Sequence, residues 1–167
     1  MNQGNTEDQQ KKKPRFKITL CYNNTDKQKA QILESILVAR GFRVNLVDNK
    51  SHGNFLSGQL VDSVRSTICF IILSTTSILN SSLVNQEIGY AQGKGLKTIL
   101  LVSTKLKNEL HDIKSHLTIM EFTEDDFMQK CFSIADMAIK ISEIMEEPID
   151  FEAFLDFYAK TKDSSLP

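Results

Sequence analysis

The sequence lacks three features that would assign it to a broad class of protein: a strong charge of one sign, a long apolar run and a secretion signal. Lysine and arginine (20) nearly balance aspartate and glutamate (21), so the formal net charge is −1. The sequence therefore lacks the excess of positive charge that is typical of nucleic-acid-binding domains. No apolar run reaches the ~18 residues needed to span a bilayer. The first residues lack the charged start and apolar middle of a secretion signal. We therefore expect no nucleic-acid partner and no membrane partner.

The sequence also has few cysteines and lacks the known cysteine and glycine motifs of metal, redox and nucleotide sites. The three cysteines lie far apart, with no Cys-x-x-Cys motif and no zinc-site spacing. Cys21 and Cys69 fall in apolar stretches, where cysteine behaves as a small hydrophobe. These features predict a cytoplasmic protein without a metal site. The glycine fingerprints of dinucleotide-binding redox domains and of P-loop proteins are missing, which argues against redox chemistry and phosphoryl transfer.

What is present suits one packed domain, because 41% of the 167 residues are hydrophobic and 25% are charged. Residues 1–14 form a polar leader, and its basic cluster is expected to be solvated rather than to form a binding arm. The domain itself is expected over residues 15–147. A C-terminal amphipathic helix and tail are expected over residues 148–167.

Hydrophobic periodicity predicts strands that alternate with helices. The expected strands are residues 16–20, 44–47, 68–73, 98–102 and 117–122. The expected helices are residues 30–37, 56–68, 82–93, 106–113 and 126–144. Gly41 should end the first helix, and Thr123 with Asp126 resembles a capping box that opens the last. The alternation predicts an α/β fold, with a five-stranded parallel sheet, right-handed crossovers and helices on both faces.

The run at residues 68–73 is continuously apolar, which is typical of a central strand covered on both faces. In such an open sheet, ligands bind beyond the carboxyl ends of the strands, where the strand order reverses. If the order is 2-1-3-4-5, that point lies between the first and third strands. Loops 23–26, 48–55 and 74–82 then surround the predicted crevice.

One acidic residue lies at the edge of an apolar helix face beside this crevice. In the helix at residues 82–93, Leu83, Glu87 and Ala91 are spaced by four and form one stripe, next to Ile88. A carboxylate there is costly unless it is paired or functional. Spacing alone favours an early-helix acid that gains ~0.3–1 kcal/mol from the helix dipole, and it leaves a catalytic role open.

Several segments, taken in order, resemble a TIR domain. Residues 17–26, ending in Tyr-Asn-Asn-Thr-Asp, are similar to the first TIR strand and its Ser-Tyr-x-x-x-Asp turn. Residues 81–87 (SSLVNQE) resemble the family segment that runs from a serine, through a tryptophan, to a glutamate. Further matches are residues 41–48, 71–74 and 91–100. The resemblance covers roughly residues 16 to 145, nearly the whole predicted domain.

The resemblance implies a flavodoxin-like fold and, as in many microbial and plant members, an NAD+ nucleosidase that cleaves the nicotinamide–ribose bond. It implies that Glu87 is catalytic, either steadying an oxocarbenium-like state or attacking the anomeric carbon. NAD+ would be the substrate, no cofactor is expected, and the product is ADP-ribose or a cyclic ADP-ribose isomer. It also suggests a stand-alone protein of microbial immunity or virulence signalling, which acts through self-association or with other TIR proteins.

The candidates for substrate contact are polar or aromatic residues near the predicted crevice. Asn23, Asn24 and Asp26 suit a ribose or a phosphate. His52 is either a ring-stacking residue or a solvated loop residue, and Phe55 either stacks or anchors the following helix. The full set is Tyr22, Asn23, Asn24, Asp26, Asp48, His52, Phe55, Ser74, Ser81 and Leu83.

Three positions depart from the family pattern. Leu83 stands where the family has tryptophan, and Asn23 replaces a serine beside Tyr22. Both departures bear on the substrate contacts. Residues 49–55, the predicted BB loop, contain no proline and lack the Arg-Asp-x-x-Pro-Gly pattern of animal receptors. This third departure argues against an animal-type receptor adaptor.

Two alternatives to the NAD+ nucleosidase stay open. Residues 87–91 (EIGYA) with residues 93–95 (GKG) resemble the glutamate segment of nucleoside 2-deoxyribosyltransferases, which share a similar fold and use the acid as nucleophile. The other alternative is a non-enzymatic scaffold that acts only through TIR–TIR association.

The C-terminal residues 150–160 predict an amphipathic helix. One face carries Phe151, Phe154, Leu155 and Tyr158. A stripe this aromatic must be covered, either by packing on the domain or by docking onto a partner helix or protomer.

Overall fold

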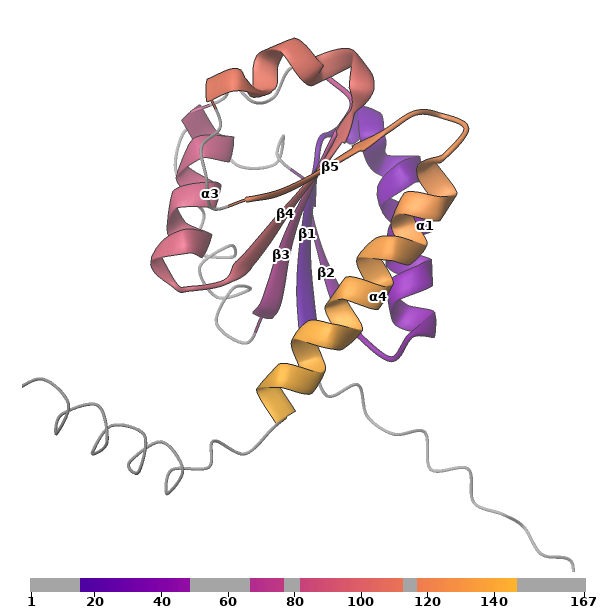
Figure 1. Ribbon diagram of the computed structural model, residues 1–167, viewed down its shortest axis with the longest axis vertical. Coiled ribbons are helices and arrows are strands. Elements are labelled where there is room, and N and C mark those ends of the chain that lie inside the picture. The colour runs from indigo at the N-terminus through magenta and orange to yellow at the C-terminus, as the bar shows by residue number, and fades with distance from the viewer. Residues whose placement is uncertain (1–15, 49–66, 77–81, 113–116, 147–167) are drawn as a thin grey trace, which may run out of the picture.

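A computed structural model describes residues 16–48, 67–76, 82–112 and 117–146 (Figure 1). Five strands form one sheet in the order β2-β1-β3-β4-β5, and every neighbouring pair is parallel. This confirms the predicted flavodoxin-like α/β fold. The strands are β1 (Lys17–Tyr22), β2 (Arg43–Asp48), β3 (Thr67–Ser74), β4 (Lys97–Ser103) and β5 (Thr118–Phe122).

Helices cover both faces of the sheet. Helices α1 (Lys27–Ala39) and α4 (Phe127–Glu146) lie together on one face, and α3 (Ser82–Gly93) lies on the other (Figure 1). Two 3₁₀ helices, η1 (Asn24–Asp26) and η2 (Thr104–Asp112), follow β1 and β4. The predicted helix at residues 106–113 is therefore a 3₁₀ helix, and the predicted helix at residues 82–93 has the bounds expected from its pattern.

The central strand explains the apolar run at its position. All eight residues of β3 are buried. Cys69, Ile71 and Leu73 belong to the core beneath α1 and α4, whereas Phe70 and Ile72 belong to the core beneath α3. Because successive side chains of a strand point to opposite faces, only a strand covered on both faces reads as continuously apolar.

Gly41 ends the first helix as predicted. Its φ of +90° is a conformation that glycine adopts without the Cβ penalty, and its N–H donates to the carbonyl of Val38 at 2.9 Å. The Phe42 N–H then donates to the carbonyl of Leu37 at 3.1 Å. This reversal returns the chain to the sheet, where the Arg43 N–H meets the carbonyl of Phe16 at 2.9 Å.

The capping box at the start of the last helix is also confirmed. The Thr123 N–H donates to Oδ1 of Asp126 at 2.6 Å, and the Asp126 N–H donates to Oγ1 of Thr123 at 3.3 Å. The donation from Thr123 is the main reason why the pKa of Asp126 lies below its usual value. Both residues lie in the turn that leads into α4.

Some predictions fall outside the described residues. They include the leader at 1–14, the tail at 148–167 and most of the predicted helix at 56–68, although Thr67 and Ile68 belong to β3. Within the described ranges, no helix combines the length and apolar character needed to cross a membrane. All three cysteines lie in this part of the chain, and each is a buried free thiol.

Candidate functional site

The carboxyl ends of the first three strands meet at one edge of the sheet. β1 ends at Tyr22, which is in register with Asp48 at the end of β2 and with Leu73, next to Ser74, in β3. The strand order reverses between β1 and β3, so this edge is the switch point that the pattern of elements predicts. The structure thereby brings together three of the predicted site residues.

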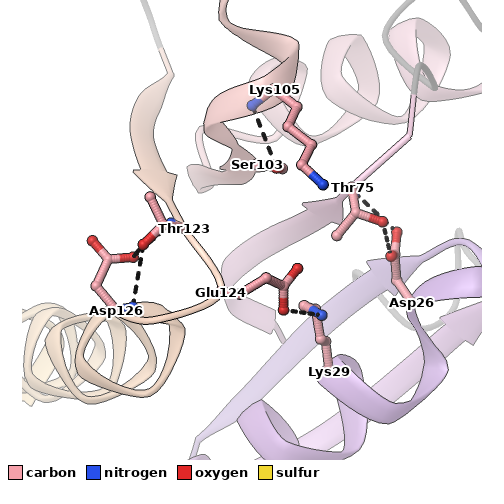
Figure 2. Close-up of polar contacts among 8 residues, drawn as sticks. All are labelled: Asp26, Lys29, Thr75, Ser103, Lys105, Thr123, Glu124 and Asp126. Carbon is pink, nitrogen blue, oxygen red and sulfur yellow. Dashed lines mark hydrogen bonds and ion pairs between the residues drawn. The ribbon is translucent and has the colours of Figure 1, made fainter.

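A buried carboxylate joins the two sides of the switch point. Asp26 closes η1 and is only 2% exposed. Its Oδ2 accepts the backbone N–H of Thr75 at 3.1 Å, and its Oδ1 accepts the Thr75 hydroxyl (Figure 2). Because Thr75 directly follows β3, this contact ties the β1–α1 connection to the end of the central strand. Asp26 was predicted to meet substrate, and here its carboxylate has a protein partner.

The two asparagines before Asp26 shape the same turn. Oδ1 of Asn23 accepts the Asn24 N–H at 2.9 Å, and the Asn23 carbonyl accepts the Asp26 N–H at 2.6 Å. Asn23 is partly buried and Asn24 is exposed. The side chain of Asn24 is thus accessible at the edge, whereas Asn23 holds the turn through its own amide oxygen.

Tyr22 and Ser74 are less accessible than the sequence suggests. Tyr22 belongs to the core beneath α1 and α4, and burial, followed by the charges of Asp48 and Glu34, raises the pKa of its hydroxyl. The hydroxyl therefore stays protonated at neutral pH and can act as a donor. Ser74 is fully buried, and its hydroxyl donates to the carbonyl of Thr76 at 2.5 Å.

Two lysines near this edge, Lys105 and Lys29, were not predicted from the sequence. η2 follows β4, and the Lys105 N–H meets Oγ of Ser103 at 3.4 Å, while the exposed Lys105 side chain extends toward Thr75 in Figure 2. On the α1 side, Lys29 forms an ion pair with Glu124 at 2.8 Å. Thr75 could have been found from the sequence, because it lies in loop 74–82, which the predicted topology puts beside the crevice. No sequence pattern indicates Lys105.

Glu87 lies in the middle of α3, on the face of the sheet opposite α1 and α4. Its neighbour Ile88 and the following Ala91 are buried, whereas Asn85 and Gln86 are exposed. Position 87 therefore adjoins the buried face, as the spacing predicts. The side chains of Glu87 and Leu83, and all of His52, Phe55 and Ser81, lie outside the described residues, so their predicted roles stay predictions.

No group of three or more potential metal ligands occurs among the described residues. Near this edge Asn24 and Lys105 offer exposed polar side chains. An amide and an ammonium group suit a ligand with hydroxyls and negative charge.

Comparison with known proteins places the chain in a family. The model of the TIR domain family matches residues 18–132, and no curated protein matches the chain. An archaeal flavodoxin is 12% identical over 76% of this chain and 99% of its own, with a TM-score of 0.51.

Two further solved structures are similar. The CMP N-glycosidase BcmB of Clostridium botulinum is 22% identical, covering 68% of this chain and 98% of its own, with a TM-score of 0.46. The TIR domains of the activated Roq1 resistosome are 12% identical, covering 77% and 78%, with a TM-score of 0.43. Since the family model matches well over half of the sequence, the chain belongs to the TIR domain family.

Proposed function

We propose that this TIR domain is an NAD+ nucleosidase with Glu87 as its catalytic residue. One observation carries the proposal: Glu87 adjoins the buried face of α3, the helix that follows the central strand beyond the switch point. α3 begins on the carboxyl side of β3 and leads back to the amino end of β4. Position 87 lies in the first half of this helix, the half nearer the carboxyl edge at which open α/β sheets bind ligands.

The chemistry needs one carboxylate and no general acid. The bond between C1′ of the ribose and the pyridinium nitrogen breaks, and its electron pair goes to the nitrogen, so nicotinamide leaves as a neutral molecule. Positive charge develops on the ribosyl carbon, as in glycoside hydrolysis. Glu87 steadies this charge or attacks C1′. Water then bonds to C1′ and releases a proton to give ADP-ribose, or the adenine ring bonds to C1′ to give a cyclic isomer. Where Glu87 has bonded to C1′, either attack breaks that bond and returns the electron pair to the carboxylate.

The groups at the sheet edge suit the rest of the substrate. Asn24 can hydrogen-bond the ribose hydroxyls, and Lys105 supplies positive charge for the diphosphate. Tyr22, which is 7% exposed, ends β1 at the same edge. Asp26 and Thr75 hold the β1 and β3 ends at a fixed separation. His52, Phe55, Ser81 and Leu83 are further proposed contacts, and Asn23, Asp48 and Ser74 complete the surrounding edge.

A flavin is a poor fit at this edge, despite the flavodoxin-like fold. In such folds a phosphate is favoured at a helix N-terminus, where backbone N–H groups and the dipole attract it. Here the buried Asp26 carboxylate stands directly before Lys27, the first residue of α1. A phosphate at this turn would face a negative charge.

Membership in the family also supports a cellular role. We propose a cytoplasmic signalling protein of microbial immunity or virulence, which self-associates or binds other TIR proteins. In that setting NAD+ cleavage would produce a signal, and assembly would control its rate.

One assay tests the activity. Concentrated protein is mixed with NAD+, nicotinamide release is followed, and chromatography separates ADP-ribose from cyclic isomers. Glu87→Gln keeps the shape of the side chain and removes its charge, so release should fall by roughly 10²–10³-fold. Glu143→Gln makes the same change at an exposed position of α4 and should keep full activity.

Parallel incubations distinguish the alternatives. Transfer or release of bases from deoxynucleosides, without cleavage of NAD+, would favour a 2-deoxyribosyltransferase-like enzyme. If neither substrate reacts and Glu87→Gln leaves the cellular effect intact, the protein is a scaffold. Undiminished nicotinamide release by Glu87→Gln would remove Glu87 from the mechanism.

A further inference from the structure

The helices α1 and α4 lie side by side on one face of the sheet and run in the same direction from its carboxyl edge (Figure 1). Two ion pairs join them. Lys29 near the start of α1 meets Glu124 just before α4 at 2.8 Å, and Arg40 after the end of α1 meets Asp136 at 3.0 Å. The Lys29 ammonium also lies 5.7 Å from the centre of the Phe127 ring. These contacts link the beginnings of the two helices, and they link the end of α1 to the middle of α4.

Between the ion pairs, apolar side chains face each other and remain open to solvent. Ile32 shares the stripe of Arg40 on α1, because the positions are spaced by multiples of four. Met128 and Phe132 share the stripe of Asp136 on α4 in the same way. Since Arg40 contacts Asp136, these two stripes point toward each other. Ile32, Met128 and Phe132 are 39%, 48% and 45% exposed, and we name these three residues the α1–α4 seam.

Half-exposed isoleucine, methionine and phenylalanine side chains on two neighbouring helices offer apolar area that a docked segment would bury. Residues 147–167 follow the end of α4, and residues 150–160 carry an aromatic stripe of their own that also needs a cover. The exposed apolar side chains of the seam and the aromatic stripe that the tail sequence carries are natural partners for each other.

The tail is long enough to reach the seam. Phe132 lies roughly 21 Å along α4 from its last residue, Glu146, at 1.5 Å per residue. Residues 147–150 span about 13 Å when extended. A helix from Phe151 adds about 6 Å by Leu155. Three further residues of helix, to Tyr158, add about 5 Å more. Tyr158, at the end of the tail stripe, therefore reaches the level of Phe132 when the tail folds back along α4.

Charge is compatible with this placement. The basic groups Lys29 and Arg40 stand at the two ends of the seam. The tail brings the acids Asp150, Glu152 and Asp156. In a helix Asp156 lies opposite Phe154, whereas Asp150 and Glu152 border the stripe, one beside Phe154 and the other beside Leu155. All three acids can meet solvent at the margins of the contact while the apolar stripe is buried.

We propose that residues 150–160 of the chain dock on the α1–α4 seam of the same molecule. The contact covers the aromatic stripe of the tail and the exposed apolar side chains of the two helices. It closes the face of the domain opposite α3, and it is independent of any catalytic role of Glu87.

Hydrogen exchange of the full chain, followed by mass spectrometry, tests the contact. Amides of residues 150–160 should exchange at least tenfold more slowly than in an unstructured peptide, at every protein concentration. Phe132→Ser should raise their exchange about tenfold, and Met128→Ser should do the same to a smaller degree. Val38→Ser is the matched control, because Val38 is 53% exposed on α1 but lies outside the stripe that faces α4.

Each outcome decides the proposal. Circular dichroism identifies a variant that fails to fold, and the other seam variant then carries the test. Phe154→Ser, made in the tail, should accelerate exchange at residues 150–160 without changing the domain. Tail amides that exchange as fast as an unstructured peptide would overturn the proposal. Protection that grows with protein concentration and accompanies a dimer in light scattering would assign the seam to a second copy instead.

Discussion

Replacing Asp26 tests whether the two connections at the switch point are held together by one carboxylate. Asp26 is 2% exposed and accepts both the backbone N–H and the hydroxyl of Thr75. A hydrogen bond to a charged group contributes about 1.5–3 kcal/mol. Thr75 is partly exposed, so water replaces part of what is lost. Asp26→Ala should therefore lower the free energy of unfolding by about 2–4 kcal/mol.

Two companion variants separate the charge from the contacts. Asp26→Asn keeps an acceptor oxygen in place, so its cost should be smaller than that of Asp26→Ala. Thr75→Val removes the hydroxyl and keeps the backbone N–H, which should cost about 1–2 kcal/mol. The double variant Asp26→Ala with Thr75→Val should cost less than the sum of the two single variants, because they remove a shared interaction.

Urea denaturation measures all four proteins, and the shift in midpoint at unchanged slope gives each difference. Burying a carboxylate is itself unfavourable, so the opposite result is physically reasonable. If Asp26→Ala or Asp26→Asn is as stable as the unmodified chain, the Thr75 bonds do not offset the cost of burial. The carboxylate would then be better explained by contact with substrate, and the structural argument would fail.

Three further predictions concern positions away from the switch point. Gly41→Ala should lower the free energy of unfolding by about 1 kcal/mol, because φ is +90° although no neighbour lies within 4 Å of the added Cβ. Gly89→Ala, in equally open space within α3, should raise it by roughly 0.5–1 kcal/mol. Thermal unfolding compares the two variants. The three cysteines should resist alkylation at pH 8 in the native protein and react fully in urea, as counted by mass spectrometry. They are all buried, and burial raises the pKa of Cys69 and of Cys131 to about 12. The pKa of Asp126 is lower in the folded state than in the unfolded state, where it is near 3.9. The ionised carboxylate therefore stabilises the fold above that pH, and the contribution is lost as the pH falls through the folded pKa. Asp126→Asn should show a shallower loss of stability in acid, and an identical acid profile would contradict the capping role.

The strands were predictable because each carries a local signal, whereas their order came from the flavodoxin-like pattern of the family that the chain resembles, and the pairing confirms it. A continuous apolar run identified β3, alternation identified β1, and Gly41 and the Thr123–Asp126 box marked helix ends. The type of η2 was not predictable in the same way. Its periodic apolar residues fit an α-helix, but the segment forms a 3₁₀ helix directly after β4. Periodicity detects an apolar face and does not count the residues in a turn.

The site was predictable only to the level of its loops. Topology nominated the connection at residues 23–26, but which side chain turns inward depends on the η1 turn and on Thr75 across the edge. Lys105 comes near this edge because η2 begins directly after β4, and no pattern within residues 104–112 indicates that its side chain extends toward Thr75 (Figure 2). Contacts between residues far apart in sequence have no local signature, so composition and spacing leave them open.

The parallel pairing of β1 with both β2 and β3 has a consequence for biosynthesis. β2 follows β1 after one helix, but the partner on the other side of β1, beginning with Thr67 opposite Lys17, is made roughly fifty residues later. Until that segment leaves the ribosome, the buried strand beginning at Ile18 has one open hydrogen-bonding edge on the nascent chain. Pausing of translation between these two strands would prolong this exposed state and favour binding of the nascent chain by chaperones. A permuted gene that starts at β3 would shorten the time for which the edge of β1 is exposed.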